Sequence, residues 1–226
     1  MDYGTVERGS FIRRLNRFTA VVQIRHAETI CHVKNTGRLG ELLLPGAAVY
    51  LKYCDQAARK TQWDLLAVEK DGQIINVDSQ APNAVFHEFA AQQRFRTDIR
   101  RIRREFTYED SRFDFCLECE TGVQFVEVKG VTLLCDGCAY FPDAPTARGV
   151  KHLHGLTRAV GAGYEAAAVF VLQMKRAQCL RPNDATQPAF GQALREAAAA
   201  GVRLYAYDCH VTAQMLEIDA PVPVLL

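Results

Sequence analysis

Two short segments alternate apolar and polar residues, Arg112-Phe-Asp-Phe-Cys-Leu-Glu118 and Phe125-Val-Glu-Val-Lys129. This alternation is typical of β-strands that have two different faces. The connection between them, Glu120-Thr-Gly122, is short enough for a hairpin turn. We therefore expect the two strands to be antiparallel neighbours in the sheet around which the second half of the chain is built.

The alternation also predicts which side chains share a face. In the first strand, one face carries Phe113, Phe115 and Leu117, and the other carries Asp114, Cys116 and Glu118. In the second strand, Glu127 and Lys129 point the same way, and Val126 and Val128 point the opposite way. Asp114 and Glu127 are therefore expected to approach each other from adjacent strands, with Lys129 beside them.

Two carboxylates and a lysine in this arrangement suit the hydrolysis of phosphodiester bonds. Carboxylate oxygens bind Mg²⁺ or Mn²⁺, and the cation can polarise a phosphate and lower the pKa of an attacking water. Lys129 can orient that water or stabilise developing negative charge. The alternative that the pattern leaves open is an internal ion pair between Lys129 and one of the carboxylates.

The remaining pattern predicts an N-terminal barrel and a C-terminal α/β domain. The first part contains strand-like segments with turn residues between them, as in a small barrel of the oligonucleotide-binding (OB) type: 18–24, 32–33, 47–53, 63–69 and 73–77, with a helical turn at 39–44. The second part alternates helices at 84–95, 146–160 and 190–200 with strands at 104–108, 112–118, 123–131, 167–172 and 202–207. The fold class is therefore mixed α/β, with domains at 1–80 and 81–226.

The domain boundary is expected at residues 79–83, where Pro82 disfavours a helical Ala81 and Asn83 is a good N-cap. No stretch approaches the roughly 18 to 20 apolar residues that span a bilayer, and the polar N-terminus lacks the centre of a secretory signal. We expect a soluble cytoplasmic protein that binds no membrane. The net charge is +1, but residues 94–104 carry six arginines, either as a solvated helix face or as a phosphate-binding patch.

Four of the eight cysteines have the spacing of a zinc ribbon: Cys116, Cys119, Cys135 and Cys138. A hairpin between the two central strands would leave the two cysteine pairs up to roughly 35 Å apart, at ~3.3 Å per strand residue. Zinc requires all four sulfurs within bonding distance of one point. We therefore expect free thiols in a reducing compartment, with Cys116 near the active face.

The chain resembles the sugar fermentation stimulation protein A family over most of its length. The matching stretches run in order: His32-Val-Lys-Asn-Thr-Gly-Arg-Leu-Gly-Glu-Leu-Leu43, Arg59-Lys-Thr61, Trp63-Asp-Leu65, Val77-Asp-Ser-Gln-Ala-Pro-Asn83, Ser111-Arg-Phe-Asp-Phe115, Glu127-Val-Lys-Gly-Val-Thr-Leu133 and Phe141-Pro-Asp-Ala-Pro-Thr-Ala-Arg-Gly-Val-Lys-His152. The resemblance implies an OB-like N-terminal domain, a PD-(D/E)xK (restriction-endonuclease-like) nuclease domain with a central mixed sheet, and DNA binding.

The resemblance also implies roles for individual residues. Asp114, Glu127 and Lys129 match the nuclease motif, and Glu88 on the preceding helix matches an acid that would complete the metal shell. Two positions depart from the family pattern. Phe113 stands where the name of the motif would put proline, and Gly155 stands where a glutamate is expected, which puts the acid of the second long helix in doubt.

Several further residues are candidates for nucleic-acid binding. Thr146 can cap a helix whose free N–H groups favour an anion, and Arg148, Lys151 and His152 share one face of that helix. Arg38, Arg59, Lys60 and Arg112 are the other predicted phosphate contacts. The alternatives are a purely structural helix start, with Asp143 as an ion-pair partner, and a packing role for His152.

The function predicted from the sequence is a magnesium-dependent nuclease that binds DNA. The alternative is a regulator that binds DNA without cutting it, in keeping with the family's link to sugar metabolism. A scaffold for protein partners would instead show no salt-dependent affinity for DNA. The sequence leaves open whether the DNA is single- or double-stranded, whether RNA is also bound, and whether the chain forms a homodimer.

Overall fold

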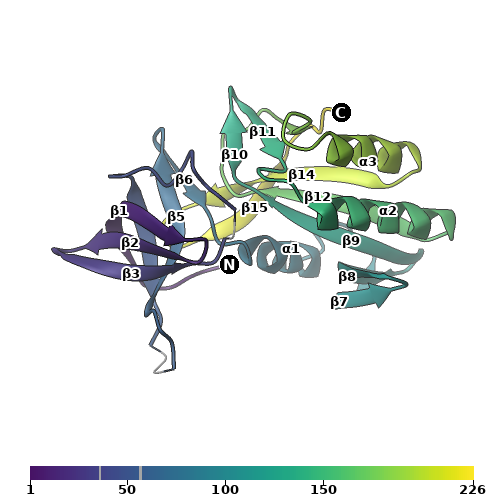
Figure 1. Ribbon diagram of the computed structural model, residues 1–226. Coiled ribbons are helices and arrows are strands. Elements are labelled where there is room, and N and C mark those ends of the chain that lie inside the picture. Colours follow the sequence, from purple (N-terminus) through teal and green to yellow (C-terminus); the bar gives the residue numbers. More distant parts are fainter. Residues whose placement is uncertain (36, 56–57) are drawn as a thin grey trace.

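The computed structural model describes residues 1–35, 37–55 and 58–226, which form a barrel followed by a layered sheet domain (Figure 1). The barrel strands are β1 (Val6–Asn16), β2 (Thr19–Ile24), β3 (Ala27–Val33), β4 (Ala48–Tyr53) and β5 (Trp63–Lys70), followed by β6 (Gln73–Asn76). They pair in the order β3-β2-β1-β4-β5-β6, and a parallel pairing of β3 with β5 closes the barrel. The prediction of a small OB-like barrel is confirmed.

The barrel differs from the prediction in two places. β1 is eleven residues long and pairs with both β2 and β4, although its sequence gave no strand signal. Charged residues interrupt its apolar positions because most of this strand is only half-buried. The predicted helical turn at 39–44 is a series of hydrogen-bonded turns, in which Leu39 has a positive φ and packs into the barrel core.

The second domain is a mixed six-stranded sheet covered by helices on both faces. Its elements are α1 (Ala81–Ala91), β7 (Ile99–Tyr108), β8 (Ser111–Cys119), β9 (Gly122–Val131), α2 (Ala147–Gly161), β12 (Glu165–Leu172), α3 (Pro188–Ala199), β14 (Arg203–Val211) and β15 (Leu216–Pro221). The strand order is β15-β14-β12-β9-β8-β7. One core lies between the sheet and α1, and a second lies between the sheet and the helices α2 and α3. The predicted mixed α/β class is confirmed.

The hairpin β8–β9 has the predicted antiparallel pairing, but the alternation of faces breaks at Asp114. The paired positions run from Cys119–Gly122 to Phe115–Val126, which places Asp114 opposite Glu127 at the next step. Phe115 packs in the core under α1, whereas Phe113 packs in the core under α2. The prediction that these two phenylalanines share a face is therefore wrong, because the strand turns over at Asp114, beside Glu105 of β7 with its positive φ.

The start of α1 and the arginine-rich segment also differ from the prediction. Helix α1 begins at Ala81, with Gln80 as its N-cap and Pro82 in the first turn, where the missing N–H of proline costs nothing. Asn83 therefore lies inside the helix and is not its cap. The arginines from Arg100 to Arg104 lie on β7, at the exposed edge of the sheet, and do not form a helix face.

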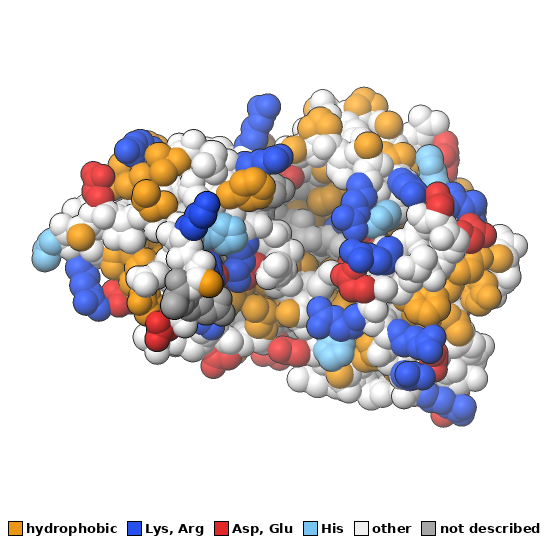
Figure 2. Space-filling view, turned by 60° about the horizontal axis from the view of Figure 1, so that its bottom comes forward, with side chains coloured by type: hydrophobic (Ala, Val, Ile, Leu, Met, Phe, Trp, Pro, Cys, Tyr) orange, Lys and Arg blue, Asp and Glu red, His pale blue; other side chains and the backbone are white. Residues whose placement is uncertain are grey.

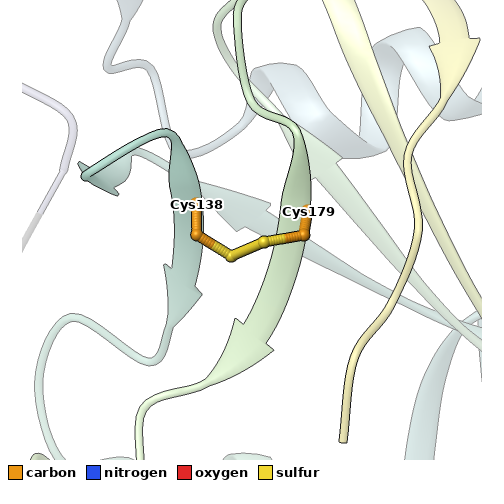
Figure 3. Close-up of a disulfide and its surroundings, with 2 residues drawn as sticks. All are labelled: Cys138 and Cys179. Carbon is orange, nitrogen blue, oxygen red and sulfur yellow. A yellow bond between two sulfur atoms is a disulfide. The ribbon is translucent and has the colours of Figure 1, made fainter.

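A small third sheet contains a disulfide. It consists of β10 (Leu133–Cys135), β11 (Cys138–Phe141) and β13 (Cys179–Pro182), and its parallel pair β11–β13 sets Cys138 opposite Cys179. These cysteines are bonded, with their Cα atoms 4.9 Å apart (Figure 3). The expectation of a free thiol at Cys138 is therefore wrong. Of the other three, Cys116 and Cys119 are buried and Cys135 is exposed, all as free thiols.

The two domains are joined through polar contacts as well as through the chain. Gln173, just after β12, bonds to the backbone and side chain of Asn76 at the end of β6. Met174 packs into the barrel core. The first three residues leave the barrel and bond to the second domain near Leu216. These contacts connect the two domains, and a recess lies between them (Figure 2). Among the described residues, no helix is long and apolar enough to cross a membrane.

Candidate functional site

Glu127 is a buried carboxylate in which only one oxygen has a partner. Its Oε1 accepts a hydrogen bond of 2.6 Å from Lys129 Nζ and a second from Nδ1 of His152. Its Oε2 is buried and has no hydrogen-bond partner among the described residues. Burial works to raise the pKa of Glu127, but the hydrogen bond from His152 and the charge of Lys129 outweigh it and hold this pKa below its ordinary value. Glu127 is therefore an anion with one oxygen still available.

Asp114 lies opposite Glu127, at the point where β8 and β9 stop pairing. Its Oδ2 accepts a bond of 2.8 Å from the backbone N–H of Val128, and its Oδ1 accepts one of 2.9 Å from the side chain of Asn83. Burial raises the pKa of Asp114, and the neighbouring charge of Glu127 raises it further. Two buried carboxylates that repel each other are the arrangement that a bound cation would stabilise.

The residues at this point fit a divalent cation. Without a bound cation, the buried Oε2 of Glu127 would lose its hydration and gain no hydrogen bond or ion pair within the described part of the chain. Asp114 supplies further carboxylate lone pairs at the same strand position, and hard oxygen ligands are those that Mg²⁺ and Ca²⁺ prefer. Among residues 1–35, 37–55 and 58–226, no group of three or more His, Cys, Asp or Glu side chains gathers as a metal cluster. Water would complete the shell of a cation held by these two acids.

Glu88 does not join this pair. It lies on α1, is half exposed, and forms an ion pair of 2.6 Å with the N-terminal amine of Met1. Asn83 is the α1 residue that contacts Asp114, and residues five apart on a helix point to different sides. The expectation that Glu88 completes the metal shell is therefore not met. Asn83 was predicted to be the N-cap, but it lies in the first turn of α1, which begins at Ala81, and there its side chain contacts Asp114.

Helix α2 supplies the second support of the site. Thr146 Oγ1 accepts a bond of 2.9 Å from the N–H of Gly149 and so caps the helix, as the sequence predicted. Arg148 lies in the first turn of α2, and its Nε is 3.4 Å from Nε2 of His152, one turn further along the helix. Nδ1 of His152 bonds to Glu127. With Arg148 donating to Nε2, the assigned tautomer of His152 carries its proton on Nδ1. His152 thus holds Glu127 in place and is buried, in keeping with a positioning role.

Two other predicted phosphate contacts are engaged elsewhere. Lys151 points to the β7–β8 turn, where its Nζ lies 3.4 Å from Asp110. Arg112 forms an exposed ion pair of 2.9 Å with Glu105. Gly155 lies where α2 touches β8, and a Cβ there would come within 2.5 Å of Ser111 Oγ. A larger residue at this position would require Ser111 and Phe113 to shift, so glycine is the residue that fits the observed contact between α2 and β8.

The barrel supplies a basic pocket on its side of the recess. Arg59 and Lys60 line an opening of about 420 Å³ together with His32, Lys34 and Asp64. Arg59 is ion-paired with Asp64, whereas Lys60 is exposed. Arg38 is also exposed and follows Gly37, which approaches Asp143 of the second domain. Figure 2 shows the recess between the domains, with Lys, Arg and His side chains along both of its sides.

The fold and the site together define a class of protein in which an OB barrel is joined to a mixed α/β domain that holds paired acids. The family models match in the same order: the SfsA N-terminal OB domain over residues 12–77, and the sugar fermentation stimulation protein RE domain over residues 80–215. The chain belongs to the sugar fermentation stimulation protein family, as its resemblance indicated.

Similar proteins match along the full chain. A sugar fermentation stimulation protein homolog of Desulfitobacterium hafniense is 50% identical over 217 residues, which cover 96% of this chain and 95% of that protein. A homolog of Ruminiclostridium cellulolyticum is 45% identical over 226 residues, covering 100% of both chains. The structure of Pyrococcus furiosus SfsA in complex with Ca²⁺ superposes with a TM-score of 0.91 at 29% identity, covering 100% of this chain and 98% of that one.

Proposed function

We propose that this chain is a nuclease that uses a divalent cation to hydrolyse phosphodiester bonds of DNA. The observation that carries the proposal is the buried Oε2 of Glu127, which has no partner among the described residues and lies beside Asp114. The Pyrococcus furiosus relative was determined in complex with Ca²⁺, a cation that takes the same oxygen ligands as Mg²⁺ and Mn²⁺.

Asp114 and Glu127 would hold the cation, which supplies polarisation of the scissile phosphate and a lower pKa for the attacking water. Lys129 has its ammonium at the same strand edge, where it would stabilise negative charge that develops on the phosphate. Asn83 and His152 orient the two carboxylates, each by a hydrogen bond to one acid. The exposed Lys60 and the half-exposed Arg59 would attract the DNA backbone into the recess.

A regulator that binds DNA without cutting it is the second candidate. The ion pair between Lys129 and Glu127 favours it, because Lys129 already neutralises one oxygen of the acid at 2.6 Å. In this case the acids would have a structural role, and the basic sides of the recess would account for binding. The two candidates differ in whether the bound DNA is cleaved, so one assay separates them.

The test is to incubate the chain with single- and double-stranded DNA, and with RNA, in Mg²⁺, Mn²⁺ or EDTA. We expect cleavage that requires the cation and falls about 10³-fold in Glu127→Gln, since a catalytic cation contributes several kcal/mol to the transition state. Glu88→Gln is the matched control and should cut like the unaltered chain, because Glu88 pairs with Met1.

Three outcomes are informative. Cation-dependent cleavage that disappears in Glu127→Gln and persists in Glu88→Gln supports the nuclease. Salt-sensitive binding to DNA without any cleavage supports the regulator. Cleavage that is unchanged in Glu127→Gln would show that a different site, or a contaminant, cuts the DNA.

A further inference from the structure

A small cavity lies where β9 passes between the two domains. Its volume is about 120 Å³. Both domains contribute to its wall, which consists of Asn35, Ser79, Gly130, Val131, Thr132, Tyr140, Phe141, Asp143 and Gln173. None of the predicted site residues lines it. Its position is nevertheless close to the acid pair, because Gly130 directly follows Lys129 in β9 and lies three residues from Glu127.

The wall of this cavity is polar, and two of its hydroxyl groups have no hydrogen-bond partner among the described residues. Thr132 is buried and Tyr140 is half-buried, and neither hydroxyl has a hydrogen bond within the described part of the chain. Asp143 forms no ion pair with a described residue; burial raises the pKa of its carboxyl, and hydrogen bonds from the backbone N–H groups of Asp143 and Ala144 oppose this rise. The hydroxyl oxygens of Thr132 and Tyr140 are not among the enclosed side-chain atoms that lack a partner, so they are accessible from the cavity and can form hydrogen bonds to a ligand with its own donors and acceptors.

The charge of the wall argues against a phosphate in this cavity. No Lys or Arg is among its lining residues, and Asp143 would repel an anion. A purely apolar ligand would leave the hydroxyls of Thr132 and Tyr140 without partners. The chemistry that fits is a neutral, planar group with hydrogen-bonding edges. A nucleobase has these properties, and Tyr140 offers an aromatic side chain for stacking.

The size of the cavity selects among the bases. An apolar cavity of about 150 Å³ is known to hold one benzene ring. At about 120 Å³, this open cavity is slightly smaller than that, so its size favours a single ring over the fused rings of a purine. The backbone at Gly130 is also close to its neighbours, since a Cβ there would lie 2.5 Å from Gln173 Oε1 and 2.6 Å from Pro82 Cγ. The wall therefore cannot easily widen on that side.

We propose that this cavity receives one unpaired pyrimidine base of a nucleic acid whose phosphate lies at Asp114 and Glu127. The inference rests on the proposed nuclease function and adds to it a preference for a substrate with an unstacked base beside the cut. A base inside an intact duplex cannot enter, because it is stacked and paired. A loop, a flap or a single strand leaves the base available at the lowest cost.

The test measures the affinity of the chain for matched DNA duplexes by fluorescence anisotropy, in Ca²⁺ and in EDTA. The duplexes are identical except at one central position, which carries an unpaired cytosine, an unpaired adenine, an abasic site or a normal base pair. We expect the unpaired cytosine to bind about tenfold more tightly than the abasic site, which is within the range of stacking one base on an aromatic ring.

Variants of the lining residues test whether the difference in affinity between cytosine and abasic DNA arises in this cavity. Tyr140→Ala should reduce the ratio between cytosine and abasic DNA to about one, while affinity for the paired duplex stays the same. Thr132→Val, which keeps the shape of the side chain, should reduce the ratio in part. Tyr164→Ala is the matched control, since Tyr164 is a partly exposed tyrosine that packs on Phe125, at the other end of β9 and β12. Circular dichroism checks that each variant is folded.

Each result has a defined meaning. Equal affinity for cytosine and abasic DNA in the unaltered chain would overturn the inference while the proposed nuclease stands. Equal or tighter binding of adenine would also overturn it, because the cavity would then not select a single ring. Failure to bind any of the four duplexes or a single strand would overturn the proposed function, and this inference with it.

Discussion

Two buried acids, one in each domain, have opposite hydrogen-bonding surroundings. Asp64 in the barrel is contacted by Arg59, by Lys34 at 3.4 Å and by His32 at 3.4 Å, and both of its oxygens have partners. Glu127 in the sheet has two partners on one oxygen and none on the other among the described residues. The first acid is satisfied by the protein alone, whereas the second has an oxygen available for something that the chain does not supply.

The pKa of Asp114 distinguishes the acid pair from Asp64, although the pKa of Glu127, like that of Asp64, lies below its ordinary value. Burial works to raise the pKa of Asp64, but Arg59 and Lys34 outweigh it and hold this pKa below its ordinary value. Burial and the charge of Glu127 instead raise the pKa of Asp114. The protein thus surrounds Asp64 with positively charged side chains. Asp114 and Glu127, in contrast, have too little positive charge around them for two carboxylates. This shortage is the physical basis for placing the cation in the sheet domain.

The largest expected effect is on the stability of the barrel. Asp64→Asn would leave Arg59 and Lys34 without their buried partner, and loss of one member of a buried pair typically costs about 3–5 kcal/mol. We expect the Tm of the chain to fall by roughly 10 °C, measured by calorimetry without added cation. Asp71→Asn makes the same chemical change at an exposed hairpin and should leave Tm unchanged. A small effect of Asp64→Asn would mean that the two acids do not differ as described.

The next effect concerns cation affinity. Asn83→Ala removes the hydrogen bond to Oδ1 of Asp114 without changing either acid. Loss of such an orienting partner typically weakens metal binding about 10- to 100-fold. Titration calorimetry with Mn²⁺ measures the change. Gln92→Ala, at the exposed end of the same helix, is the control and should bind Mn²⁺ normally. Equal affinity in both variants would remove Asn83 from the site.

A smaller effect of opposite sign is expected for Asp114→Asn. Because the folded pKa of Asp114 lies above its ordinary value, ionised Asp114 costs stability at a pH above that pKa, and the neutral amide removes this cost. We expect Tm without cation to rise by roughly 2–4 °C, the shift that about 1 kcal/mol gives in a chain of this size. Glu127→Gln should instead lower Tm, since it removes the carboxylate charge that pairs with Lys129 and accepts the hydrogen bond from His152. A fall of Tm in both variants would contradict the contrast between the acids.

The smallest effect is a pH dependence of cation binding. Mn²⁺ binds ionised carboxylates, so its affinity should fall as the pH decreases through the raised pKa of Asp114. The pKa of Glu127 lies below its ordinary value, so Glu127 is protonated less readily than an ordinary glutamate in this window. Calorimetric titrations between about pH 4 and pH 7 should therefore show that Mn²⁺ binding releases up to about one proton from Asp114 at the acid end of this range. An affinity that is flat above the ordinary pKa of Asp, 3.8, would show that Asp114 is not a ligand.

The position of the acid pair could be predicted from the sequence because it depends on local rules. A hairpin with a short turn fixes its register, and that register sets Asp114 opposite Glu127. The same rules fail for Phe113, because strict alternation cannot anticipate that β8 turns over at Asp114. They also fail for Asn83, because the direction of a helical side chain depends on where the helix begins and on what it packs against.

Other features depend on contacts between distant parts of the chain. Cys138 and Cys179 meet because β11 and β13 pair across a sequence separation of 41 residues, and strands of four residues carry little pattern. Glu88 matched a family position, but the N-terminus folds back onto α1 and takes that carboxylate into an ion pair. The cavity beside Gly130 is built by both domains, so no single segment of sequence indicates it.

The most direct test of the cation site is titration calorimetry of Mn²⁺ into four proteins: the unaltered chain, Asp114→Ala, Glu127→Gln and Asp64→Asn, each at a temperature where it is folded. We expect one binding event in the unaltered chain, its loss in the two sheet variants, and its retention in the barrel variant. Undiminished binding in Asp114→Ala and Glu127→Gln, or no binding in the unaltered chain, would show that Asp114 and Glu127 do not form a cation site.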